Sequence, residues 1–422
     1  MALGRTFLIS ASTLMSGTVV AQAITFGLSF VLARLYDPAE FGHYSIFVGF
    51  AGAFGVASTG ALDRVVLLGR SDSEARRAAT TLLVLCIGLA VVVSIAGILL
   101  ALLPVSRALP LSPFDFAVMV PLFMLFYAGA QVLTYSSLRQ GRVRHLATLK
   151  ISQSVVMGAV QVSTAALRSI PGLIIGNIAG WFVLFAAGMR WRLSLGHLAR
   201  DLRRQSLVAL VRRNWRYPRY VMPNEVLDGL SNQVPLFFVG MFVSLTAAGH
   251  YGLALMILSG PAALLGQAVG QAFLQHMGGA EDDPVKLRQA TRRIWLGMAL
   301  VGVVPFGAIL LLGPAIFRVG FGTEWTDAGV IAQLLAALLF VRFVSSPTST
   351  LYWKLNMQRE QWYFSVAAAC YRAGCYALLW TGLSLVTVII LHVVIEILAI
   401  AFYNFVLLRR LHAREREQRA AA

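Results

Sequence analysis

The sequence predicts an all-α polytopic membrane protein with about twelve transmembrane helices in two six-helix lobes. Two observations lead to this fold class. Of the 422 residues, 58% are hydrophobic and only 13% are charged, which is not the composition of a soluble globular protein of this length. The apolar residues also gather in long runs, and a helix needs about 20 mainly apolar residues to cross the hydrocarbon core of a bilayer.

Twelve stretches are predicted to span the membrane. In the first half of the chain they cover residues 8–33, 41–68, 79–103, 115–138, 146–167 and 172–190. In the second half they cover residues 220–243, 248–274, 294–313, 327–352, 362–382 and 385–407. The first stretch follows only one basic residue, Arg5, and is too long for the apolar core of a signal peptide, so we expect an uncleaved helix.

The basic residues predict the orientation of the chain. With the N-terminus in the cytoplasm, 28 of the 35 Lys and Arg residues fall in cytoplasmic segments and four fall outside. Positive residues concentrate on the cytoplasmic side of membrane proteins, so we expect both termini to be cytoplasmic. The net charge of +17 is spread over short clusters between apolar runs, and we therefore expect no nucleic-acid partner.

A basic segment near the middle divides the chain. We predict an N-terminal lobe (1–190), a cytoplasmic linker (191–219), a C-terminal lobe (220–407) and a cytoplasmic tail (408–422). Apolar residues of the linker recur three and four apart, ending in Val208, Val211 and Trp215, with arginines off that face. This pattern predicts an amphipathic helix on the lipid surface. A positive-inside loop without further role would explain the same arginines.

Short matches between the two halves indicate an internal duplication. Gly42-His43-Tyr44 follows the first predicted helix of the first half, and Gly249-His250-Tyr251 follows the first predicted helix of the second. Matches of three residues arise by chance, but these two stand at equivalent places in the topology. They favour a parallel repeat of six helices, with a central cleft between two lobes.

The turn after the first predicted helix carries the most specific motif. Residues 32–45 read L-A-R-L-Y-D-P-A-E-F-G-H-Y-S, in which Asp37 and Pro38 end one helix and Glu40 lies in the first turn of the next. The motif resembles that of the oligosaccharide flippase (polysaccharide transporter) family of the multidrug/oligosaccharidyl-lipid/polysaccharide exporter superfamily. The twelve-helix layout and the length extend the resemblance over the whole chain.

The resemblance implies a function. Such a protein would flip a polyprenyl-pyrophosphate-linked oligosaccharide from the cytoplasmic to the outer leaflet of a bacterial inner membrane, by alternating access. It implies the lipid-linked glycan and membrane lipids as partners, with polysaccharide polymerases or glycosyltransferases as further ones. Peptidoglycan-precursor flippases of the same superfamily usually carry two additional helices, for which this chain is too short. That branch is therefore disfavoured.

Motifs for catalysis do not occur in the sequence. It contains neither G-x-x-x-x-G-K-[ST] nor H-E-x-x-H. We expect a protein that is not an enzyme and has no cofactor or metal, with transport driven by an H⁺ or Na⁺ gradient or by consumption of the product outside. Cys86, Cys370 and Cys375 all fall inside apolar runs, so no disulfide framework is expected.

Polar residues within the predicted spans are the candidate functional residues, because they are costly to place in lipid. Glu225, Asp228 and Asn232 follow one face of the seventh span, and Gln22 belongs to a polar stripe on the first. We expect both stripes to face the cleft, with Gln22 and Asn232 binding substrate and the two acids coupling to a cation. Packing of helix against helix through these stripes is the alternative.

Arg342 is the candidate for binding pyrophosphate. It shares one face of the tenth span with Ser345 and Ser346, which are candidate substrate contacts as well. A guanidinium offers a planar fork of donors that matches phosphate oxygens. An arginine that snorkels to the headgroups, or that pairs with Glu225 or Asp228, is the alternative.

Arg372 and Glu396 are expected at similar depth in adjacent antiparallel spans, where they would form a structural ion pair. Arg372 is also kept as a candidate substrate contact, and Glu396 as a candidate coupling acid. His392 is one helical turn from Glu396 and could complete a proton relay, although a lone intramembrane histidine is more often a packing residue. Asp63 and Arg64 are expected to reach the membrane interface.

Two other functions stay open. A cation-coupled multidrug antiporter of the same architecture would use Glu225 and Asp228, whereas Arg342 and Arg372 favour an anionic substrate. A membrane-embedded glycan polymerase or ligase normally needs a large outer loop with catalytic residues. The predicted outer connections are all short.

Overall fold

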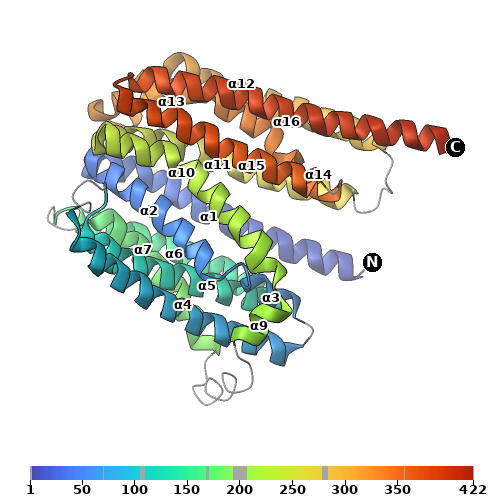
Figure 1. Ribbon diagram of the computed structural model, residues 1–422, viewed down its shortest axis with the longest axis horizontal. Helices are drawn as coiled ribbons and strands as arrows, with labels where there is room; N and C mark the ends of the chain where they lie inside the picture. Colours follow the sequence, from blue (N-terminus) through green and yellow to red (C-terminus); the bar gives the residue numbers. More distant parts are fainter. Residues whose placement is uncertain are drawn as a thin grey trace. The chain divides into compact units, whose positions relative to one another are not determined.

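The computed structural model describes residues 2–69, 71–104, 110–167, 171–192, 207–277, 284–355 and 357–421. These residues are helical almost throughout, and none of them forms a strand (Figure 1). They divide into two compact units, Met1–Gln233 and Val234–Ala422. The predicted all-α class is thereby confirmed, and the predicted limits of the linker and the tail stay predictions.

Nine helices carry most of the first unit. They are α1 (Ala2–Leu35), α2 (Pro38–Ser58), α3 (Asp63–Leu68), α4 (Asp72–Ala101), α5 (Val120–Arg139), α6 (Val143–Thr164), α7 (Gly172–Arg192), α9 (Leu207–Arg213) and the beginning of α10 (Met222–Phe242). Short π-helical turns lead into two of them, Asp115–Met119 before α5 and Tyr217–Val221 before α10.

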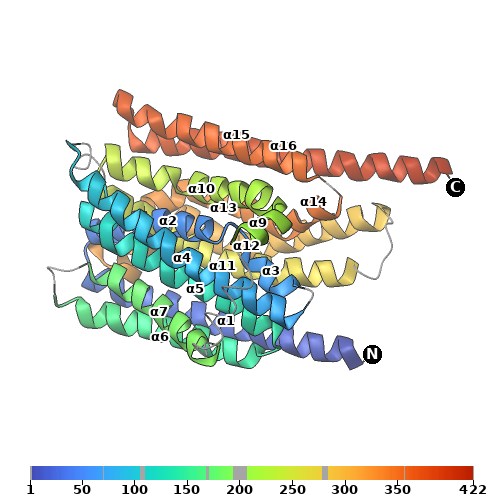
Figure 2. The same ribbon diagram turned by 60° about the horizontal axis from the view of Figure 1, so that its bottom comes forward.

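In the described part of the second unit, the end of α10 is followed by six further helices. These are α11 (Leu245–Met277), α12 (Pro284–Phe321), α13 (Thr326–Ser345), α14 (Leu351–Lys354), α15 (Gln358–Ala377) and α16 (Leu385–Ala421). Three 3₁₀ turns connect them, Thr323–Trp325, Ser346–Thr350 and Leu378–Thr381. Helix α15 lies beside α16 in both views (Figures 1 and 2).

The start of α2 has the structure that the sequence predicts. The Asp37 side chain accepts a hydrogen bond from the backbone N–H of Glu40 at 2.8 Å, and the Glu40 carboxylate accepts one from the N–H of Asp37 at 3.0 Å. This reciprocal pair satisfies two donors that a helix start otherwise leaves without a partner. Pro38 occupies the first turn, where its missing N–H costs nothing.

The predicted second span, residues 41–68, is wrong as one continuous helix. Helix α2 ends at Ser58, and α3 begins at Asp63 after a turn. Gly60 and Ala61 in that turn have φ values of 58° and 57°, a left-handed conformation that cannot continue a right-handed helix. The side chains of Ala61 and Leu62 are buried, which helps to hold the turn in place.

A second interruption follows α13. The predicted span 327–352 is helical as far as Ser345, then tightens into the 3₁₀ turn that contains Pro347. A proline inside a helix removes a backbone hydrogen bond and clashes with the preceding turn, which explains the break. Trp295 of α12 donates its indole N–H to the Thr348 hydroxyl at 2.9 Å and so fixes the turn.

Nine helices of the described residues are long and apolar enough to cross a membrane. They are α1, α2, α4, α5 with its π turn, α7, α11, α12, α13 and α16. The other three predicted spans correspond to the more polar helices α6, α10 and α15. The count of twelve spans and the cytoplasmic termini therefore stay predictions.

The same packing pattern recurs in the two units. In the first, α5 packs against α2, α4 and α7, and α6 packs against α7. In the second, α13 packs against α11, α12 and α16, and α15 packs against α16. The corresponding helices follow one another in the same order along the chain: α2, α4, α5, α6 and α7 in the first unit, and α11, α12, α13, α15 and α16 in the second. This correspondence supports the predicted duplication.

Matched polar contacts support the duplication at the level of single residues. His43 Nε2 lies 2.8 Å from the Asp115 carboxylate in the first unit. His250 Nε2 lies 2.9 Å from the backbone carbonyl of Glu324 in the second. The next residue in each half, Tyr44 and Tyr251, places its hydroxyl against a side chain of a later helix. The two Gly-His-Tyr triplets thus hold equivalent structural positions.

The basic linker is described only in part, because residues 193–206 lie outside the described residues. In α9 the predicted contact of an apolar face with lipid stays a prediction. Val208 is 74% exposed, whereas Leu210 is buried in a cluster with residues of α3 and α4 such as Val66 and Leu82. Arg213 pairs with Glu74 of α4 at 2.9 Å. Packing on α3 and α4 therefore sets the buried face of α9.

Candidate functional site

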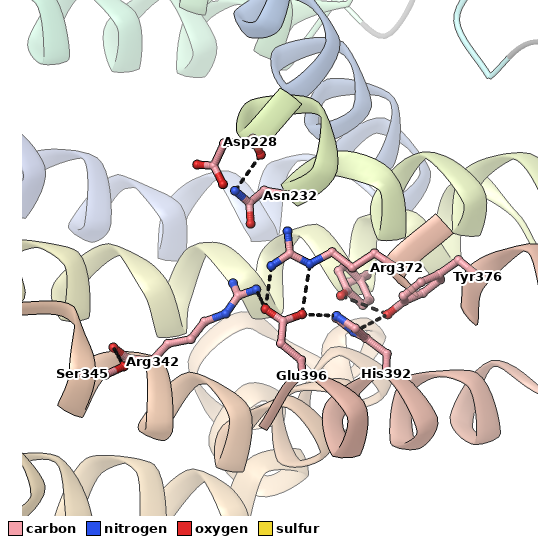
Figure 3. A network of polar contacts seen from close by, with 9 residues as sticks. Asp228, Asn232, Arg342, Ser345, Arg372, Tyr376, His392 and Glu396 are labelled. Carbon is pink, nitrogen blue, oxygen red and sulfur yellow. Dashed lines mark hydrogen bonds and ion pairs between the residues drawn. The ribbon is translucent and has the colours of Figure 1, made fainter. Parts of the chain in front are cut away.

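A buried carboxylate lies at the centre of the charged residues of the second unit. The Glu396 side chain of α16 is 2% exposed and has three ionisable neighbours (Figure 3). Arg372 of α15 donates through Nε to Oε2 at 3.0 Å and through Nη2 to Oε1 at 2.6 Å. Arg342 of α13 pairs with the same Oε1, and His392 Nε2 lies 2.6 Å from Oε2. The predicted pair of Arg372 and Glu396 is therefore present.

The packing of three helices explains why these side chains meet. Helix α16 packs against both α13 and α15, so residues from all three converge on one point. The other acids in the described helices of this unit lie near helix ends. Glu324 precedes α13 and Asp327 lies in its first turn, Glu360 lies in the first turn of α15, and Glu415 and Glu417 lie near the end of α16. Within this unit, two guanidiniums accordingly share one mid-helix carboxylate.

The two arginines differ in exposure. The Arg372 side chain is 6% exposed and the Arg342 side chain is 33% exposed. A fully buried arginine with a bidentate carboxylate partner is an element of packing. Arg342 is held by the same carboxylate, and one-third of its side chain is exposed. It is the more exposed of the two arginines.

A row of buried hydrogen bonds continues from Glu396 away from Arg342. His392 Nδ1 lies 3.3 Å from the Tyr376 hydroxyl, which lies 3.2 Å from the hydroxyl of Tyr251 on α11. All three side chains are buried. The predicted proximity of His392 and Glu396 is present, and the row could hold or pass one proton. Neither tyrosine was predicted, although Tyr376 is one helical turn from Arg372 and Tyr251 belongs to the repeated triplet.

The two serines near Arg342 use their hydroxyls within their own helix. Ser345 donates to the carbonyls of Val341 and Arg342 at 2.9 and 3.3 Å, and Ser346 donates to the carbonyl of Phe343 at 3.1 Å. Such bonds are common where a helix bends. Their predicted role as substrate contacts stays a prediction.

A separate cavity of about 330 Å³ lies in the first unit, between α2, α3, α5 and α10. Glu225 and Asp228 of α10 both line it, and Glu225 pairs with Arg64 of α3. Asp63 and Arg64 both line this cavity, and their expected position at the membrane interface stays a prediction. The alternative that Arg342 pairs with Glu225 or Asp228 stays open.

The remaining predicted site residues have exposed side chains. Gln22 lies on the exposed face of α1, and Asn232 lies one turn after Asp228 on α10. The Asn232 amide donates to the backbone carbonyl of Asp228 at 2.8 Å (Figure 3). Their roles in substrate binding stay predictions.

Comparison with solved structures defines the class of fold. The chain is similar to the lipid II flippase MurJ in an inward closed conformation, with a TM-score of 0.69 and 11% identity over 94% of this chain and 89% of that one. It is similar to a multidrug resistance MATE family transporter of the MOP superfamily in its outward-facing form, with a TM-score of 0.58 and 15% identity over 96% of each chain. At this identity the likeness is one of fold alone.

Comparison of sequences defines the family. The chain belongs to a family of polysaccharide biosynthesis proteins, whose profile matches residues 31–330. It is also 22% identical over 165 residues to the amylovoran biosynthesis protein AmsL of Erwinia amylovora. That match covers 39% of this chain and 42% of the relative, so the chain spans less than half the length of that protein. The family resemblance found in the sequence is confirmed.

Proposed function

We propose that the protein is a transporter, and not an enzyme, that flips a polyprenyl-pyrophosphate-linked oligosaccharide from the cytoplasmic to the outer leaflet of a bacterial inner membrane. Membership of a polysaccharide biosynthesis family supports the class of substrate. The likeness of fold to a lipid II flippase and to MATE transporters supports a transport role and alternating access between two six-helix lobes. Polysaccharide polymerases or glycosyltransferases would be its partners.

The observation that carries the proposal is the partly exposed side chain of Arg342 beside the carboxylate of Glu396. A pyrophosphate that enters a membrane protein loses part of its hydration, and fixed cations must replace the lost contacts. Arg342 is one-third exposed, and its partner Glu396 is shared with Arg372. Glu396 therefore orients the Arg342 cation, and the negative charge of this carboxylate is shared between Arg342 and Arg372.

The proposed coupling ion is H⁺, with Na⁺ as the alternative. Glu396 and His392 are in direct contact inside the membrane-spanning helices, and the two tyrosines extend their hydrogen bonds. A histidine is the side chain that most readily exchanges a proton near neutral pH. An anion that engages Arg342 would compete with Glu396 for its guanidinium, which would link substrate binding to the contact between Glu396 and His392.

A cation-coupled multidrug antiporter is the second candidate. The fold likeness to MATE transporters and the two acids in the cavity of the first unit favour it. Against it, Glu225 is already paired with Arg64. A carboxylate that is held by a guanidinium is a poorer site for a cationic drug.

Deletion of the gene tests the proposal. We expect a lipid-linked saccharide to accumulate in the inner membrane, on the cytoplasmic leaflet. Intact cells would be treated with periodate followed by an impermeant hydrazide, and the lipid extract would be compared with that of lysed cells. Labelling only after lysis is the expected result. Labelling in intact cells, or no accumulation together with sensitivity to cationic drugs, would favour another function.

A further inference from the structure

We propose that the cavity of the first unit binds the saccharide part of the substrate. This inference rests on the proposed flippase function. It assigns to Asp63, Arg64, Glu225 and Asp228 a role that differs from cation coupling.

The polar groups of the cavity suit a polyol. Asp63 and Asp228 offer carboxylate oxygens that accept hydrogen bonds, whereas Arg64 offers N–H donors, and Gln131 and Tyr135 offer both kinds of group. A sugar hydroxyl both donates and accepts, so its binding site needs the two kinds of partner side by side. Binding pockets begin at about 300 Å³. The 330 Å³ of this cavity would take a small part of an oligosaccharide.

One wall of the cavity is an aromatic ring that cannot easily move. The ring of Tyr127 lies so close to Gly55 that a Cβ at Gly55 would meet its Cδ1 atom at 2.5 Å. On other sides the ring packs edge-on against Trp181, with centroids 4.7 Å apart, and stacks with Phe123 at 5.6 Å. The Gln131 amide donates to the Tyr127 hydroxyl at 3.4 Å. A fixed ring with a polar edge is a common surface for an amphipathic ligand.

The turn between α2 and α3 places two of the polar groups. Ala61 holds a left-handed conformation that is unfavourable for an alanine, and the turn brings Asp63 and Arg64 to the cavity. Unfavourable backbone conformations of this kind gather at functional sites. A continuous helix over this stretch would direct the two side chains elsewhere.

Two other ligands fit the cavity less well. Among the described residues, no three His, Cys, Asp or Glu side chains come together as a metal ion would require. A pyrophosphate would meet three acids, of which only Glu225 has an arginine partner within the cavity. Burial raises the pKa of the Asp63 carboxyl, which lies outside the membrane spans.

Gly229 provides a direct test, because it lines the cavity and a Cβ added there would meet no atom within 4 Å. Gly229→Leu would reduce the volume of the cavity from a point where the added Cβ meets no wall atom. Gly88 of α4 is a matched control, since a Cβ there also meets no atom, and its neighbours Ile87 and Val91 are exposed. Gly88→Leu adds the same side chain away from the cavity. Tyr127→Phe, which keeps the ring and removes only its hydroxyl, is a milder second variant.

The measurement is binding to the purified full-length protein in nanodiscs by calorimetry. The probes are the free oligosaccharide, released by mild acid from the lipid that accumulates in the deletion strain, and inorganic pyrophosphate. We expect Gly229→Leu to weaken oligosaccharide binding at least about tenfold and Tyr127→Phe to weaken it less, whereas Gly88→Leu binds as the wild type. Arg342→Ala should weaken pyrophosphate binding and leave oligosaccharide binding unchanged.

Several outcomes would overturn the inference. They are no oligosaccharide binding by the wild type, equal oligosaccharide binding by Gly229→Leu, or loss of pyrophosphate binding in Gly229→Leu. If the wild-type protein still binds pyrophosphate through Arg342 and still exports glycan, the flippase function stands whichever of these outcomes is found. Failure of the wild type to export any glycan would instead remove the function itself.

Discussion

Glu396 accepts hydrogen bonds from Arg372 at both of its carboxylate oxygens, over 3.0 and 2.6 Å, and one of these oxygens also contacts Arg342. The buried arginine thereby fixes the carboxylate, and the carboxylate in turn orients the accessible arginine. A binding group that is held in place before its ligand arrives loses less conformational freedom on binding. The pair of Arg372 and Glu396 therefore holds the Arg342 side chain in position.

We expect the loss of Glu396 to be the most damaging single change in the cluster. Glu396→Gln leaves two guanidiniums without their shared carboxylate, and a broken buried ion pair costs about 3 to 5 kcal/mol in soluble proteins. Arg372→Leu should cost less, because Glu396 keeps Arg342 and His392 as partners. Thermal unfolding of the purified variants in one detergent measures the order.

The double variant Arg372→Leu with Glu396→Leu serves as the control for charge. It should be more stable than Glu396→Leu alone, because one of the two guanidiniums that would be left without a carboxylate is removed. If the two variants unfold at the same temperature, the contact between Arg372 and Glu396 contributes nothing to stability.

The contact between Arg64 and Glu225 should matter for activity more than for stability. Both side chains are about one-third exposed (34% and 33%), and ion pairs in contact with solvent contribute roughly 0.2 to 1 kcal/mol. Arg64→Glu or Glu225→Arg alone places like charges together in the cavity and should reduce export. The exchanged double variant should recover part of it, as measured by surface glycan per cell. Wild-type export by both single variants would show that the contact has no role.

Parts of this structure follow from sequence because they depend on residues that are close along the chain. The capping box of Asp37 and Glu40 spans one helical turn, so its hydrogen bonds can be predicted from spacing alone. Arg372 and Glu396 lie in consecutive helices joined by a short turn, which fixes their relative depth. The repeated triplets could be found by matching the two halves.

Other parts depend on packing between distant helices and could not be predicted. Arg342 and Glu396 are separated by 54 residues, and Arg64 and Glu225 by 161. Which of several arginines meets an acid depends on the rotation of each helix, and apolar patterns leave this rotation undefined when most faces are apolar. The break after Ser58 was missed because the turn contains no proline, and its residues are largely apolar.

The turn at Ala61 offers a test of backbone strain. Ala61→Gly should be neutral or stabilise the protein by up to about 1 kcal/mol, because glycine adopts a positive φ without a steric cost. Ala61→Val should destabilise it, since a β-branched side chain fits this conformation poorly and the position is buried. The thermal unfolding midpoint of Ala61→Gly should equal or exceed the wild-type value, and that of Ala61→Val should lie below it. A lower midpoint for Ala61→Gly than for Ala61→Val would contradict the assignment.

The orientation of the chain can be tested with single cysteines. In a background without Cys86, Cys370 and Cys375, we expect cysteines at Ala108 and Thr323 to react with an impermeant thiol reagent in intact cells. Thr323 is exposed and follows Gly322, whose φ of 117° makes that residue itself a poor site for substitution. A cysteine at Arg200 should react only after the cells are opened. Labelling of position 200 from outside would refute the predicted orientation.

Translocation of the extracted lipid-linked saccharide in proteoliposomes tests the role of Arg342 most directly. The saccharide would be loaded in both leaflets, and the fraction open to periodate outside would be followed with time. Wild-type protein should exchange it between leaflets, Arg342→Lys should keep a fraction of the rate because it keeps the charge and loses the fork, and Arg342→Ala should be inactive at an equal amount of folded protein. A wild-type rate for Arg342→Ala, accompanied by cationic-drug transport that is lost in Glu225→Gln, would contradict the flippase function and favour the antiporter.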